Sequence, residues 1–112
     1  MMALKAHRAL FQYLVVARPP VAVAIIKNLS LDEIDVIGMI FANVLAGVIR
    51  IGPASKSSLS LHADVIRKIA KKELKSSTRR LIILKNYQAV LDLIKSVFKQ
   101  LYPDGNGKSF ST

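Results

Sequence analysis

Apolar and polar positions along the chain predict helices almost throughout. The clearest segment is SLDEIDVIGMIFANVLAG, from Ser30 to Gly47. Ser30 and Glu33 have the spacing of a capping box, in which each side chain accepts a hydrogen bond from the other residue's backbone N–H. Asp32, Glu33 and Asp35 add negative charge where the helix dipole favours it. This pattern predicts that a helix begins at about residue 31.

An apolar run from Val36 to Ile49, interrupted only by Asn43, follows these acids, and Gly47 is placed to end the helix. The run has 14 residues, whereas a membrane span needs about 20. A helix that is apolar on all sides is expected to be buried on all sides. We therefore expect an all-α, single-domain bundle of five to six helices around a buried central helix at about 31–46.

The other predicted elements flank this helix. A helix over 4–17 stops at Arg18-Pro19-Pro20, and 21–28 is read as a helix, with a strand as the alternative. Gly52-Pro53 breaks the chain before an expected loop at 54–58. Ser58 or Ser60 then begins an amphipathic helix to about Lys75; Ser76 to Thr78 cap a short helix, and a last helix spans 87–101. The bundle is expected to occupy 1–102, with a flexible tail at 103–112.

Charge is distributed unevenly along the chain, whose net charge is +10. Residues 1–54 carry five Lys/Arg and three acids, whereas residues 55–112 carry twelve and four. A basic half joined to an apolar half is typical of a polyanion-binding bundle. The alternatives are that the charge only keeps the protein soluble, or that the basic helix contacts anionic lipid. The lipid alternative is the weakest, because the apolar side of the basic helix lacks Trp and Phe.

Lysine and arginine gather between Lys56 and Lys85, where there are nine of them and two acids. Such residues pair with phosphates, and contacts to phosphates carry no base-sequence information. The lysine-rich stripe contains few of the Asn, Gln or Arg side chains that read base edges. It also lacks aromatic residues that could stack on the bases of a single strand. The prediction is a non-enzymatic protein that binds duplex DNA, or another nucleic acid, without sequence preference. The residues predicted to contact phosphate are Arg67, Lys68, Lys71, Lys72, Lys75, Arg79 and Arg80, with a further contact from Ser77 or Thr78.

No residue pattern predicts catalysis, a metal or another cofactor. The chain has no cysteine, and its two histidines, His7 and His62, lie far apart without metal-ligand spacing. The acids at 32–35 are explained by their place in the first turns of a helix. Gly105 to Ser109 superficially resembles a phosphate loop but lacks the preceding strand and following helix. The first residues do not form a convincing signal peptide, so an intracellular location is expected.

The segments LSLDEIDVIGMIFANVLAGVIRI, LSLHADVIRKIAKK and SSTRRLIILKN together resemble small basic proteins of the adintovirus and Polinton (Maverick) group of DNA viruses and transposons. The resemblance covers about residues 25–95 and implies a viral or transposon core or accessory component that acts on DNA, in the nucleus or within a virus particle. The matching positions are Glu33, Ile34, Ile37, Asn43, Leu45, Gly47, Lys56, Leu59, His62, Ile66, Arg67, Arg79 and Arg80.

A second functional hypothesis is a homo-oligomeric or partner-binding assembly module. Its sequence basis is the apolar excess: Val48, Ile49 and Ile51 lie beside the Gly52-Pro53 break, and they are difficult to place together inside one small bundle. An apolar groove or face that accepts a partner helix is the structure that this hypothesis predicts.

Overall fold

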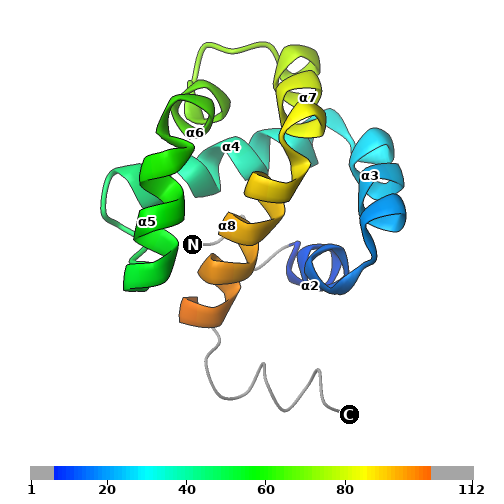
Figure 1. Cartoon of the computed structure of the whole chain (residues 1–112). Helices are drawn as coiled ribbons and strands as arrows, with labels where there is room; N and C mark the ends of the chain where they lie inside the picture. Colours follow the sequence, from blue (N-terminus) through cyan, green and yellow to red (C-terminus); the bar gives the residue numbers. More distant parts are fainter. Residues whose placement is uncertain (1–6, 102–112) are drawn as a thin grey trace.

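The computed structural model describes residues 7–101, which form helices joined by short connections, without a strand in that range. Figure 1 shows them arranged around α4, which crosses the middle of the molecule. The all-α fold is therefore confirmed, with seven helices in the described range rather than five or six. They are α2 (Arg8–Val16), α3 (Pro19–Asn28), α4 (Leu31–Leu45), α5 (Pro53–Leu61), α6 (Ala63–Ala70), α7 (Ser76–Lys85) and α8 (Tyr87–Leu101).

The start of α4 has the predicted capping box. Ser30 Oγ accepts a hydrogen bond from the Glu33 backbone N–H, with 3.1 Å between oxygen and nitrogen. Glu33 Oε1 accepts one from the Ser30 N–H at 2.7 Å. Gly47 has a φ of 78°, a conformation that glycine adopts without strain, and lies just beyond the end of the helix. Both ends of α4 are thus determined by local sequence.

The capping box gives a direct stability prediction. Ser30→Ala removes one acceptor for the first N–H groups of α4 and is expected to lower the free energy of unfolding by about 1 kcal/mol. Urea denaturation monitored by helical circular dichroism measures this change. Ser57→Ala is a suitable control, because the exposed Ser57 hydroxyl only makes a long bond of 3.4 Å to a carbonyl within its own helix; an equal loss in both variants would contradict the prediction.

Burial of α4 is extensive but not complete, so the expectation of burial on all sides is wrong. Seven of its residues are buried, and α6 and α7 are its main neighbours. The side chain of Met39 is 49% exposed, and Ala42 on the next turn is also exposed. α4 therefore keeps one open stripe, which its neighbours do not cover in the described part of the chain.

The segment between Gly52 and Lys75 differs most from expectation. The predicted loop at 54–58 is the start of α5, which Pro53 initiates from the first turn. The predicted long helix to Lys75 is interrupted at His62, whose φ of −109° and ψ of 21° separate α5 from α6. α6 already ends at Ala70, so the five residues 71–75 form a connection outside any helix.

The remaining boundaries follow the sequence more closely. α3 is a helix rather than the alternative strand, with prolines in its first turn. α8 has the predicted bounds, and α2 covers Arg8–Val16 of the helix expected at 4–17, with His7 and Ala17 as its caps. α7 begins earlier than expected: Ser76 lies within it, and its N-cap, Lys75, makes no side-chain capping bond. The proposed tail at 103–112 lies outside the described residues.

The core joins all the helices except α5, which contributes no fully buried side chain among its described residues. Phe11 of α2 and Phe98 of α8 lie with their ring centroids 6.4 Å apart. The loop after α4 contributes as well, because Ile49 and Ile51 are 5% and 7% exposed. Two of the three apolar residues that were difficult to place by sequence are thus core residues.

Candidate nucleic-acid interface

The seven residues predicted to contact phosphate fall into two groups in the structure. Five are exposed, at the end of α6 and in the connection that follows it. The other two, Arg79 and Arg80, lie on α7 and are buried and half-buried, respectively. The exposed group is called the basic junction below: Arg67, Lys68, Lys71, Lys72 and Lys75.

The basic junction is not the single helical stripe that the sequence predicted. Only Arg67 and Lys68 belong to α6, whereas Lys71, Lys72 and Lys75 lie in the 71–75 connection. Lys71 has extended backbone, with φ −64° and ψ 121°, which ends the helix. The connection contains one tight turn, in which the Leu74 N–H donates to the Lys71 carbonyl at 3.2 Å. Three lysines are therefore presented by a short turn.

Few acids offset this charge. Asp64 lies 3.6 Å from Arg67 across one turn of α6, and both side chains are mostly exposed. Such a pair contributes little to stability, because water and salt screen it. Glu73 is exposed within the connection. The five cations of the junction thus exceed these two acids, and the three lysines have no ion-pair partner among the described residues.

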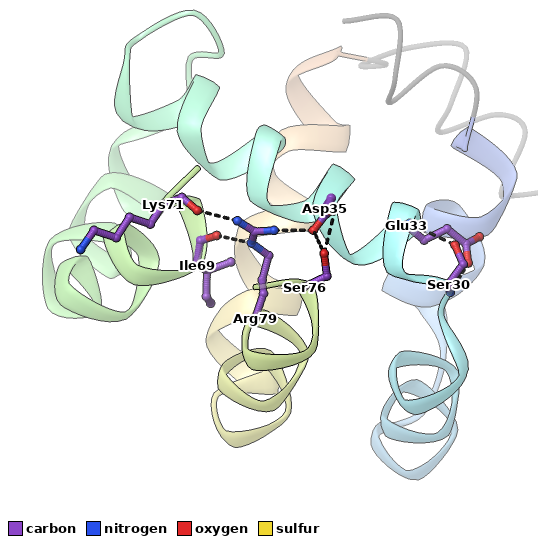
Figure 2. A network of polar contacts seen from close by, with 7 residues as sticks. All are labelled: Ser30, Glu33, Asp35, Ile69, Lys71, Ser76 and Arg79. Atoms are coloured by element: carbon purple, nitrogen blue, oxygen red, sulfur yellow. Dashed lines mark hydrogen bonds and ion pairs between the residues drawn. The ribbon is translucent and has the colours of Figure 1, made fainter. Parts of the chain in front are cut away.

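Arg79 lies inside the fold, with only 4% of its surface exposed. Figure 2 shows its guanidinium between three elements. Nε donates to the Ile69 carbonyl at 2.8 Å, and one terminal nitrogen donates to the Lys71 carbonyl at 2.5 Å. The other terminal nitrogen forms an ion pair with Asp35 of α4. The sequence placed Arg79 among surface cations, whereas its donors are directed at groups of the protein itself.

These contacts explain why α6 ends early. In a continuous helix, the carbonyls of Ile69 and Lys71 would accept from the N–H groups of residues 73 and 75. Both carbonyls instead accept hydrogen bonds from the guanidinium of Arg79. Bonds from a charged donor are about twice as strong as neutral ones. A side chain from α7 thus competes successfully with continuation of the helix.

Asp35 and Gly38 of α4 complete the surroundings of Arg79. The carboxylate of Asp35 also accepts from the Ser76 hydroxyl, at 2.7 Å and 2.9 Å to its two oxygens (Figure 2). A Cβ atom at Gly38 would lie 2.8 Å from Arg79 Nε and 3.1 Å from the Ile69 carbonyl oxygen. Glycine is therefore required at position 38, because Arg79 and the Ile69 carbonyl approach α4 closely there. In the sequence, the only trace of this contact is an acid and a glycine three residues apart on an apolar helix.

Arg80 is also largely engaged within the protein. One terminal nitrogen donates to the Leu29 carbonyl, which follows α3. Its Nε atom is buried and has no hydrogen-bond partner in the structure. Arg80 therefore links α7 to the end of α3, and it is less accessible to a ligand than the basic junction.

A hollow near His62 is lined partly by polar groups. It has a volume of about 180 Å³ between α5, α6 and α8, and its polar lining includes Ser55, Ser96 and Asp92. The two serine hydroxyls lie 2.6 Å apart, and Ser96 donates to the Asp92 carbonyl at 3.0 Å. Within residues 7–101, no hydrogen bond joins the His62 side chain to a serine or to Asp92. No group of three or more potential metal ligands was found in that range either.

Comparisons with protein-family models, with curated proteins and with solved structures give no match. The resemblance to adintovirus and Polinton proteins therefore stays a prediction. Among the helices of residues 7–101, none combines the length and apolar character that crossing a bilayer requires.

Proposed function

We propose that this protein binds nucleic acid, duplex DNA in the first instance, without sequence preference and without catalysis. The observation that carries the proposal is the basic junction: five exposed cations within nine residues, three of them on a turn fixed to the core. Lysine ammonium groups neutralise phosphates as point charges, and contacts to phosphates do not select bases. The resemblance to viral and transposon proteins supports the same proposal, with a core or accessory role in the nucleus or a virus particle.

The size of the effect can be bounded. A surface that neutralises about three to five phosphates gives a slope of log affinity against log salt of roughly −3 to −5. A protein that carries its charge only for solubility has no localised site, so substituting lysines outside the basic junction would change DNA affinity as much as substituting lysines within it. Measuring the salt dependence of variants at both places therefore separates phosphate binding from a role in solubility alone.

The basic junction can be tested by charge reversal with a matched control. The double variant Lys71→Glu/Lys72→Glu is expected to lose at least about tenfold in affinity and about 2 units of slope for fluorescent duplexes of unrelated sequence. The control Lys95→Glu/Lys99→Glu makes the same change in charge at exposed positions of α8. It is expected to change affinity by less than about threefold, because the C-terminal half of α8 runs away from the α6–α7 connection (Figure 1) and charges more than a Debye length apart are largely screened.

Several outcomes would contradict the proposal. Equal losses in the two double variants would show that the basic junction is no special surface. Absence of binding by the unmodified protein at low salt would refute nucleic-acid binding altogether. The same titration with duplex and single-stranded RNA of equal length decides which nucleic acid is preferred.

A second candidate function, assembly with copies of itself or with a partner, is favoured by exposed apolar side chains. Val48 and Leu61 are 72% and 79% exposed, and Tyr13, Val16 and Leu81 are each about 60% exposed. Exposed apolar residues become significant when they form one contiguous patch. Light scattering in the DNA-binding buffer tests this candidate: a discrete dimer or larger oligomer supports it, and a monomer at micromolar concentration opposes it.

A further inference from the structure

The turn between α6 and α7 is held in place through hydrogen bonds to backbone carbonyl groups. Arg79 joins the carbonyl of Ile69, in the last turn of α6, to that of Lys71, the first residue of the turn (Figure 2). Both bonds come from one rigid, planar group, so the two carbonyls are fixed relative to each other. Asp35 holds this group from α4, which places the turn against a helix with seven buried residues.

Anchoring of the turn affects how well its lysines can bind a ligand. A lysine ammonium ends a flexible four-carbon stem, so the backbone determines the region of space that the ammonium can reach. A mobile turn would have to become ordered when a ligand binds, and ordering each residue costs backbone entropy. A turn that is already fixed avoids this cost, and its cations can face several phosphates at once.

We propose that Arg79 is a positioning residue for phosphate binding: its guanidinium orders the Lys71–Lys75 turn and does not touch the nucleic acid itself. This inference rests on the proposed function. In the sequence, the charge of Arg79 suggested direct contact with phosphate. The role proposed here is indirect, because the residue acts through the carbonyl groups of the turn.

Arg79→Lys is the primary test, because it keeps the charge and removes the planar fork that reaches both carbonyls. Its DNA affinity is expected to fall about fivefold to tenfold, with a salt slope about 1 unit smaller in magnitude, as the ordered contacts decrease. Arg80→Lys is the matched control: it makes the same exchange on the next residue of α7, which contacts Leu29 rather than the turn. The control is expected to change affinity by less than about twofold.

A double-mutant cycle separates positioning from a general loss of structure. If Arg79 acts through the turn, Arg79→Lys should have a much smaller effect on affinity when Lys71 and Lys72 are already alanine. Titrations are made well below the melting temperature of every variant, with helical circular dichroism unchanged. An equal effect of Arg79→Lys with and without the two lysines would overturn the proposal.

Gly38→Ala supplies a second perturbation in case Arg79→Lys does not fold. The added Cβ would press on the guanidinium from α4 while leaving every charge in place, and it is expected to reduce affinity and slope in the same direction. Unchanged binding by a folded Gly38→Ala and by a folded Arg79→Lys would contradict positioning. If the unmodified protein binds DNA and charge reversal of the junction abolishes that binding, such a result removes this inference and leaves the proposed function intact.

Discussion

Arg79→Met is expected to lower the free energy of unfolding by about 3 kcal/mol. Methionine fills a similar volume but donates no hydrogen bond, so the carbonyls of Ile69 and Lys71 lose their charged donor and Asp35 loses its cation. Removing one partner of a buried pair costs about 3–5 kcal/mol. The lower end applies here, because the Asp35 side chain is 44% exposed and water can solvate it.

Urea denaturation measures this loss, with Arg67→Met as the control. Arg67 is a mostly exposed arginine whose ion pair with Asp64 spans 3.6 Å, and its replacement is expected to change stability by less than about 0.5 kcal/mol. A similar loss in both variants would mean that loss of positive charge, rather than loss of the buried contacts, determines stability.

Gly38→Val is the second substitution with a large expected effect, a loss of about 2–3 kcal/mol. Any Cβ at this position approaches Arg79 Nε to 2.8 Å and the Ile69 carbonyl to 3.1 Å, and a branched side chain cannot rotate away from both. α6 or the guanidinium must therefore shift. Overpacking of this kind typically costs about 1–3 kcal/mol.

Ala42→Val, one turn further along α4 at an exposed position, introduces the same β-branched side chain away from Arg79. It is expected to cost less than about 1 kcal/mol, and helix propensity cannot explain a larger loss at Gly38, because valine is a better helix former than glycine. Gly38→Val should also cost less in a protein that already carries Arg79→Met, because the flexible thioether can yield to the new methyl groups. Full additivity of the two substitutions would argue against a direct clash.

Local signals made much of the fold predictable. The capping box of Ser30 and Glu33 and the glycine at 47 define α4 from neighbouring residues alone, and the apolar spacing of 87–101 defines α8. The end of α6 was not predictable in this way. The sequence continues with helix-forming lysines and a glutamate after Ala70, and what ends the helix is a side chain that follows nine residues later.

The candidate site shows the same limit. Charge counts located the exposed cations of the basic junction, because lysine rarely lies inside a protein. They could not separate Arg79 from this group, since burial of an arginine depends on an acid and a glycine that the fold brings from α4. Asp35 was explained by its place near the helix start, whereas in the structure its carboxylate binds Arg79 and Ser76.

The contact between Asp35 and Arg79 also bears on how the chain folds. The two residues are 44 positions apart, so the ion pair can form only after α4 has met α7. A compact state in which α7 docks without α4 would bury a guanidinium that lacks its carboxylate, and such a state is strongly disfavoured. The network therefore penalises partly assembled forms, and it favours unfolding of α4, α6 and α7 as a single cooperative unit.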